Sequence, residues 1–179
     1  MPPKWTFHES VPAAMDNRSL KALLHEYWLL PKHLVFSIRK AERVLVNGRY
    51  QPINFPVKAD DQITMTFLPS DFRQPFPSVL PDPTTMVEVL YEDQNLIVIN
   101  KRRGDKTHPN QPGETGATIN HLAAYLKSEN GLPYMVHRLD QETSGAIIFA
   151  KNPAVVPILV ANIAAKRIQR TYLAWVSGR

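Results

Sequence analysis

A proline-rich segment in the middle of the chain sets the first limit on its fold. Residues 69–83, PSDFRQPFPSVLPDP, contain five prolines in fifteen positions and show no hydrophobic period. Proline fixes the backbone dihedral φ and removes a hydrogen-bond donor, so such a run is excluded from helix interiors and central strands. We therefore expect an extended, semi-rigid linker, with one module at residues 1–68 and a second at residues 84–179.

The first module combines helical and strand patterns. In RSLKALLHEYWLL, apolar residues recur at the spacing of one helix face, with Asp16 or Asn17 as candidate cap and Pro31 as the stop. A second short helix fits KHLVFSIRKA. VLVNGRYQ places Asn47 and Gly48 between two strand-like runs, which predicts a tight hairpin turn. QITMTF alternates apolar and polar residues, as a half-buried strand does.

Positive charge is concentrated in this module. The net charge is +5, from 21 Lys and Arg against 16 Asp and Glu. Residues 18–49 hold seven basic and two acidic residues and so account for the whole excess. Such a segment predicts a polyanionic partner, because cations that neutralise phosphates release condensed counterions. A solvated basic face without a partner is the alternative.

Composition also narrows the location and the chemistry. The absence of cysteine excludes disulfides and thiolate metal sites. No apolar run approaches the roughly 18 residues of a membrane span, and the N-terminus lacks the apolar stretch of a secretory signal. We expect a cytoplasmic protein that does not contact the membrane.

The second module predicts a mixed, largely antiparallel sheet with helices, and hence an α+β fold class. VEVLYEDQNLIVINK indicates strands at residues 87–91 and 96–100. A helical pattern follows over residues 119–126, and SGAIIFAK has the composition of a buried strand. A further helix is expected from about Pro153, with Asn152 as candidate cap. TYLAWV is expected to be the last strand.

The stretch VHRLDQETSGAIIFAKN places His137, Arg138 and Asp140 just before a turn that leads into an apolar strand. An exposed Arg138–Asp140 pair would be worth at most ~1 kcal/mol. A hydrolase triad with Ser144 lacks a nucleophile elbow, and a kinase loop would need the order His-Arg-Asp-Leu and a glycine-rich phosphate loop. A metal site would have to use scattered histidines without ligand spacing, namely His108, His121 and His137. We predict no metal.

The combined motifs resemble known families. Residues 18–67 resemble the alpha-L RNA-binding module shared with the fourth protein of the small ribosomal subunit. EDQNLIVINK, Gly104, His108-Pro109, HRLDQETSGAIIFAKN and RTYLAWVSG, in that order and spacing, resemble the RluA-type pseudouridine synthases. This resemblance extends from residue 18 to the end and implies isomerisation of specific uridines in structured RNA without metal or organic cofactor.

The resemblance also assigns roles to residues. The catalytic aspartate of HRLD falls on Asp140, the arginine implicated in extruding the target nucleotide falls on Arg138, and the base-contacting tyrosine of YLA falls on Tyr172. Asp140 must be ionised, whether it acts as nucleophile or as base, and we expect a cationic neighbour to keep it so. The cations expected to contact RNA are Arg39, Lys40, Arg43, Arg49, Lys101, Arg102 and Arg103.

Two questions stay open at this point. The expected partner is RNA, ribosomal RNA first and transfer RNA second, but a non-catalytic RNA-binding protein or an inactive portion of a synthase is the alternative. Family catalytic domains continue well past YLA. The resemblance therefore implies an N-terminal portion, which we expect to bind RNA weakly, to self-associate and to form no pseudouridine by itself.

Overall fold

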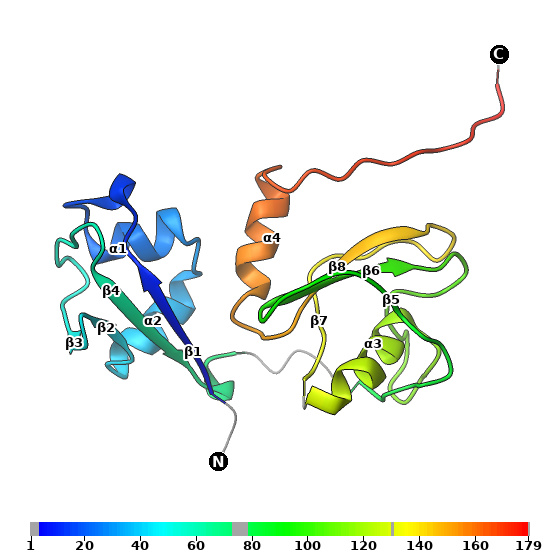
Figure 1. The fold of residues 1–179 in the computed structure, drawn as a ribbon, viewed down its shortest axis with the longest axis horizontal. Coiled ribbons are helices and arrows are strands. Elements are labelled where there is room, and N and C mark those ends of the chain that lie inside the picture. Colours follow the sequence, from blue (N-terminus) through cyan, green and yellow to red (C-terminus); the bar gives the residue numbers. More distant parts are fainter. Residues whose placement is uncertain (1–3, 73–78, 130, 179) are drawn as a thin grey trace.

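Two antiparallel four-stranded sheets form the framework of the molecule (Figure 1). The computed structural model describes residues 4–72, 79–129 and 131–178. The strand orders are β1-β4-β2-β3 in the first sheet and β5-β6-β8-β7 in the second. Each sheet carries helices and has its own cluster of buried apolar residues. The α+β class with antiparallel sheets is confirmed.

The first sheet is built from β1 (Trp5–Ser10), β2 (Val44–Val46), β3 (Arg49–Tyr50) and β4 (Gln62–Phe67). The predicted hairpin joins β2 to β3, and Asn47 and Gly48 take φ values of 50° and 77°, as the tight turn requires. In β4 the apolar residues are buried and their neighbours are not, as the alternation predicted. Strand β1, which pairs with β4 along its whole length, was not predicted.

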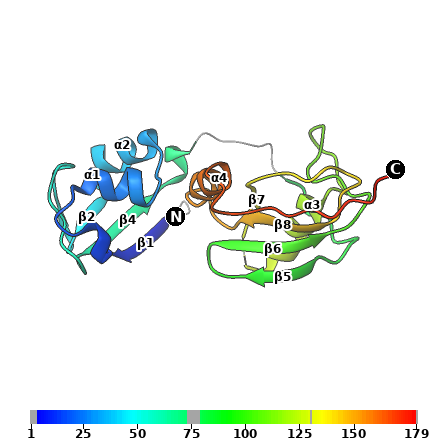
Figure 2. The same ribbon diagram turned by 90° about the horizontal axis from the view of Figure 1, so that it is seen from above.

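Short helices cover one side of this sheet (Figure 2). Helix α1 (Leu20–Ala22) continues into a π-helical turn at Leu23–Tyr27, and α2 spans Lys32–Lys40. The predicted cap of the first helix was wrong: the Ser19 hydroxyl accepts a hydrogen bond from the backbone N–H of Ala22 at 3.2 Å. Ser19 directly precedes the helix, where its oxygen reaches an unpaired N–H. Single 3-10 turns lie at Ala13–Met15 and Pro69–Asp71.

The second sheet contains β5 (Glu88–Glu92), β6 (Leu96–Lys101), β7 (Tyr134–Met135) and β8 (Gly145–Ala150). Helix α3 (Thr118–Leu126), extended by a 3-10 turn at Lys127–Glu129, packs its apolar face on one side of this sheet. Helix α4 (Val156–Ala164) lies between the two sheets in Figures 1 and 2. Ala154 and Ile158 pack against the core of the first sheet, so the two halves touch.

The expected strand TYLAWV is wrong. Residues 169–178 form neither helix nor strand and continue from α4 as an extended tail, whose end lies away from both sheets (Figure 1). Leu173 is 99% exposed and Trp175 is fully exposed. A strand is held by the backbone groups of a neighbouring strand, and no strand among the described residues pairs with this segment.

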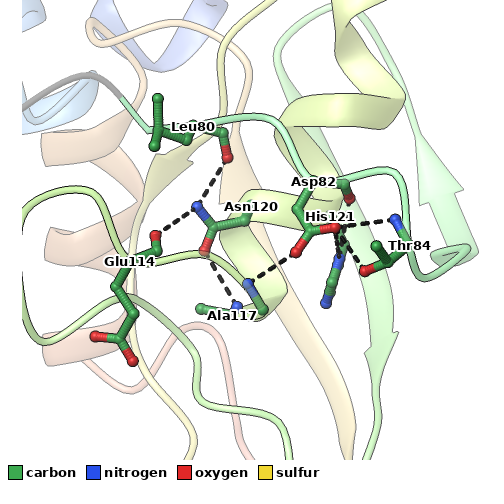
Figure 3. Close-up of polar contacts among 8 residues, drawn as sticks. Leu80, Asp82, Thr84, Glu114, Ala117, Asn120 and His121 are labelled. Atoms are coloured by element: carbon green, nitrogen blue, oxygen red, sulfur yellow. Dashed lines mark hydrogen bonds and ion pairs between the residues drawn. The ribbon is translucent and has the colours of Figure 1, made fainter.

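The end of the expected linker is fastened to α3, as Figure 3 shows. The buried carboxylate of Asp82 accepts hydrogen bonds from the backbone N–H groups of Thr84 and Gly116, both at 2.9 Å. The side-chain amide of Asn120 donates to the backbone carbonyl of Leu80 at 2.8 Å. Residues 79–83 therefore have a fixed path onto the second sheet's helix, although they form no helix or strand of their own.

The other end of the linker is also anchored, because Asp71 is buried. The central part of the expected linker, residues 73–78, lies outside the described residues. Among the residues that the structure does describe, no helix has the length and apolar character that crossing a bilayer would require.

Candidate active site and RNA interface

The loop at residues 136–144 connects β7 to β8 and carries the HRLD motif. The Leu139 side chain is buried in the core of the second sheet. The buried Thr107 hydroxyl binds both backbone groups of the same residue: it accepts from the Leu139 N–H at 3.1 Å and donates to the Leu139 carbonyl at 2.6 Å. The backbone is therefore fixed one residue before Asp140.

The loop is held on its other side by a buried ammonium group. Lys101, at the end of β6, is 1% exposed, and its Nζ donates to the backbone carbonyls of Arg102, Gln141 and Thr143 at 2.9, 3.1 and 2.8 Å. The prediction that Lys101 contacts RNA is therefore wrong, because the chain itself uses all three of its donors. The alternation of side chains along β6 could have predicted this burial. Lys101 is two residues past Ile99, so the two side chains lie on the same, buried face of the strand.

The charge of Lys101 also acts on the site. Burial lowers the pKa of Lys101, and the nearby carboxylates of Asp105, Glu142 and Asp140 oppose that decrease. Asp140 thus has a buried cation within its electrostatic range in addition to Arg138, its neighbour in the motif. Of these two cations, Arg138 is exposed and Lys101 is buried.

Asp140 itself projects into solvent. Its Oδ1 lies 3.5 Å from Nη2 of Arg138, and the two side chains are 81% and 68% exposed. Both residues line a cavity of about 210 Å³ together with His108 and Gln141. The backbone of the loop is fixed while both charged groups stay accessible, which is the arrangement that a reacting group needs.

The His137 side chain forms its hydrogen bond with strand β8 and not with the carboxylate of Asp140. Its Nε2 accepts a hydrogen bond from the backbone N–H of Ile148 in β8 at 3.2 Å. Burial lowers the pKa of His137, while the Arg138 backbone opposes this, so the neutral imidazole is favoured. Because Nε2 is occupied, the geometry gives no support to a triad of His137, Asp140 and Ser144.

Tyr172 lies in a different cavity. It lines a space of about 640 Å³ between the tail and β8, together with His137, Gly145 and Ile148. Leu139 lines both this cavity and the one that contains Asp140. The structure therefore brings Arg138 and Asp140 together and leaves Tyr172 in the neighbouring cavity.

One of the predicted RNA contacts in the first module is an internal ion pair. The Arg43 guanidinium donates to both carboxylate oxygens of Asp71, at 2.6 and 2.8 Å, and to the Thr66 carbonyl at 2.9 Å. The side chains of Arg43 and Asp71 are only 19% and 2% exposed. The charge of Arg43 is therefore paired with a buried carboxylate inside the module, which argues against a role for Arg43 in neutralising an RNA phosphate.

This ion pair has a marked effect on Asp71. Burial would raise the pKa of Asp71, but hydrogen bonds from Arg43, from the Leu68 N–H and from the Ser37 hydroxyl lower it to about 2. The hydrogen bond to Asp71 raises the pKa of Arg43 in turn. Both groups stay charged at neutral pH, so the pair ties α2 and the start of β2 to the beginning of the linker.

The remaining predicted cations are accessible. Lys40 and Arg49 are exposed and Arg39 is half-exposed in the first module. Arg102 and Arg103 are exposed beside the active loop, where the Gly104 N–H donates to the Gln141 carbonyl at 2.8 Å. Arg103 also forms an exposed pair with Glu142 at 3.1 Å. Among the described residues, no group of three His, Asp or Glu side chains could hold a metal ion.

Known protein families match most of the chain. Residues 95–178 match the family model described as RNA pseudouridylate synthase. Residues 7–63 match the model described as the RluD ribosomal pseudouridine synthase N-terminal domain. The two matches flank the proline-rich segment.

Curated relatives of this chain are also named as pseudouridine synthases. The chain is 37% identical over 141 residues to the RNA pseudouridine synthase YhcT of Bacillus subtilis, which covers 77% of this chain and 45% of that protein. It is 31% identical over 174 residues to the ribosomal large subunit pseudouridine synthase D of Neisseria meningitidis serogroup B, which covers 94% of this chain and 45% of that protein. The chain thus spans less than half the length of these relatives.

A solved structure, human RNA Pseudouridylate Synthase Domain Containing 4, is similar at 26% identity and a TM-score of 0.37, over 45% of this chain and 30% of that one. The family assignment rests on the two family models and the curated relatives, which match both halves of the chain. The chain therefore belongs to the RluA-type pseudouridine synthases.

Proposed function

We propose that this protein isomerises specific uridines of structured RNA to pseudouridine, acts on ribosomal RNA, and works in the cytoplasm. Residues 1–68 are the alpha-L RNA-binding module in this proposal, residues 69–83 the linker and residues 84–179 part of the catalytic domain. The observation that carries the proposal is the loop around Asp140, whose backbone is held by Thr107 and Lys101 while its carboxylate stays open to solvent.

The chemistry explains why a single fixed carboxylate is sufficient. Isomerisation breaks the bond between the ring nitrogen and the sugar, turns the uracil, and joins a ring carbon to the same sugar carbon, so no atom is gained or lost. Asp140 serves either as a nucleophile toward sugar or base, or as a base toward a sugar proton. Neither role needs a metal or an organic cofactor.

The groups around Asp140 are suited to bind and turn out a nucleotide. Arg138 is exposed beside the carboxylate, and in this proposal its side chain occupies the space that the flipped base leaves. Tyr172 supplies an aromatic face for that base once the tail and the loop close over one substrate. The phosphate contacts in this proposal come from the accessible cations Arg39, Lys40, Arg49, Arg102 and Arg103.

A second candidate function is favoured by the position of Tyr172. Because Tyr172 and Asp140 line separate cavities, and the tail beyond Tyr172 is exposed, the 179-residue chain alone would bind RNA without isomerising it. The exposed apolar side chains of Leu173 and Trp175 would also favour self-association of this chain. This candidate is a non-catalytic RNA-binding protein, or an inactive portion of a synthase.

The deciding experiment compares two proteins. The 179-residue chain and the product of the complete reading frame that encodes it are each incubated with unmodified ribosomal RNA transcripts and with transfer RNA transcripts. Pseudouridine is mapped chemically, RNA binding is titrated, and the mass in solution is measured. Conversion of defined ribosomal uridines by the product of the complete reading frame supports the proposal, whereas RNA binding without conversion by either protein supports the second candidate.

A further inference from the structure

The outward face of α2 carries an exposed aromatic ring that the core does not use. Leu34, Val35 and Ile38 of this helix are buried, but Phe36 points away from them and is 57% exposed. Phenylalanine is normally a buried residue, so a ring left on the surface loses the stabilisation that burial would give. Neither apolar cluster includes Phe36.

The side chains next to Phe36 on the outward face of α2 are three cations and one histidine. In an α-helix the residues three and four positions away are the neighbours of a side chain on the same face. For Phe36 these neighbours are Lys32, His33, Arg39 and Lys40, and α2 contains no acidic residue. Among the described residues, none of these side chains forms an ion pair with a carboxylate.

Helix stability does not account for this arrangement. Arg39 and Lys40 lie in the last turn of α2, where the helix dipole favours cations. Lys32 lies in the first turn, where the same dipole disfavours positive charge. The charge of Lys32 therefore acts against the stability of the helix, so helix stability does not explain its position.

The ring and a cation are already arranged together. The Arg39 guanidinium carbon lies 6.0 Å from the centroid of the Phe36 ring, at the limit of a cation–π contact. The combination of an accessible aromatic face with cations on the same surface is the one that binds single-stranded nucleic acid, because a base stacks on the ring while its phosphates meet the cations.

We infer that the outer face of α2 is a binding site for an unpaired nucleotide of RNA, with the base stacked on Phe36 and the flanking phosphates held by Lys32, Arg39 and Lys40. A base inside an A-form helix has both faces covered by its neighbours, so only a loop, bulge or single-stranded end presents one to the ring. The inference extends the proposed function, since it rests on RNA as the ligand, but it does not depend on isomerisation.

The test uses the whole 179-residue chain and measures affinity by fluorescence anisotropy. The ligands are a labelled single-stranded oligoribonucleotide, the same oligonucleotide with abasic positions, and a blunt duplex. Phe36→Ala should weaken single-strand binding roughly 5- to 100-fold, as expected for the loss of one stacked base. Binding of the duplex and of the abasic strand should change less than about 2-fold, since neither offers a free base.

Charge and stacking are separated by salt titration. Phe36→Ala should leave the slope of log affinity against log salt unchanged, because no cation is lost, whereas Lys40→Ala should reduce it by up to about 0.7. Phe36→Trp keeps an aromatic face and should restore binding to within a few-fold. Thermal melts of the variants should match the parent chain, because the ring is exposed.

Three results would overturn the inference: no binding of any RNA by the parent chain, no change on Phe36→Ala, or an equal loss for single strand and duplex. The last would mean that Phe36 packs against another surface and affects RNA indirectly. If the Phe36 results hold and no pseudouridine forms, the α2 site stands and the proposed isomerisation fails, so the two outcomes are distinguishable.

Discussion

Two Arg–Asp pairs in this molecule have the same chemical groups and opposite properties. Arg43 and Asp71 are buried in the first module and share two short hydrogen bonds. Arg138 and Asp140 are exposed in the loop of the second module and lie 3.5 Å apart. The first pair comes from residues 28 positions apart in the sequence and joins the start of β2 to the linker, whereas the second is local.

The difference shows how burial divides structural from chemical roles. A desolvated charge must be paired inside the protein, so neither Arg43 nor Asp71 is free to meet a ligand. An exposed pair contributes little stability, so Arg138 and Asp140 are free to respond to a substrate. The rigidity of the second site is supplied by Thr107 and Lys101, which bind the backbone on either side of Asp140.

The sharpest way to test the exposed pair is Asp140→Asn in whichever product of the reading frame forms pseudouridine. An amide of similar size cannot act as nucleophile or base, so conversion should fall by more than about 10⁴-fold, beyond the loss typical of an assisting acid–base group. RNA affinity and melting temperature should stay close to those of the parent. Glu142→Gln, on the same loop, is the matched control and should retain conversion within several-fold. A residual tenth of the activity in Asp140→Asn would contradict the assignment.

The buried pair is broken by Asp71→Asn. This change leaves the Arg43 charge desolvated without its partner, so the free energy of unfolding should fall by about 3–5 kcal/mol. For a chain of this size the melting temperature should drop by roughly 10 °C, measured by circular dichroism. Replacing both partners, Arg43→Met with Asp71→Leu, should recover most of that loss, and failure of the double variant to recover would show that the pair is not the source.

The Thr107 hydroxyl, which fixes the backbone of Leu139 next to the exposed pair, is tested with Thr107→Val. This change keeps the side-chain shape and removes the hydroxyl. The Leu139 N–H and carbonyl lose their partner, and the displacement of Asp140 should lower conversion by about 10²-fold. Thr107→Ser retains the hydroxyl and should rescue most of the activity. If Thr107 had only a packing role, valine would be the milder variant, and the two rates would rank in the opposite order.

The buried pair should also make the protein sensitive to acid. The pKa of Asp71 is lowered from 3.8 to about 2 in the folded chain, so its carboxylate stabilises the fold above pH 4 and this contribution is lost as the pH falls from about 4 to 2. The shift corresponds to about 2 kcal/mol. Urea titrations across this range should show a steeper loss for the parent than for Asp71→Asn, and parallel curves would disprove the coupling.

The smallest effect is expected for Arg138→Gln on stability. Because the Arg138–Asp140 pair is exposed, its loss should change the free energy of unfolding by less than about 1 kcal/mol. Conversion of uridine should nevertheless fall, since the extruding side chain is gone. A destabilisation as large as that of Asp71→Asn would remove the distinction between the two pairs.

Local patterns in the sequence were sufficient to predict most of the helices and strands and the position of the HRLD motif. Alternation predicted β4, apolar strand-like runs predicted β6 and β8, the Asn47-Gly48 pair predicted the hairpin, and HRLD marked the loop that carries Asp140. These features depend on neighbouring residues alone: side-chain period, turn dihedrals and the residue types of one short segment.

Only the tertiary structure decided which charged groups are buried and which strands find a partner. Lys101 meets the Thr143 carbonyl across 42 positions of sequence, and Arg43 meets Asp71 across 28. Strand β1 has a partner in β4, whereas the equally strand-like TYLAWV has none among the described residues. Composition shows that a cation or an apolar run is present, but its role is set by the desolvation and pairing that distant segments impose, and this information is not contained in any local window.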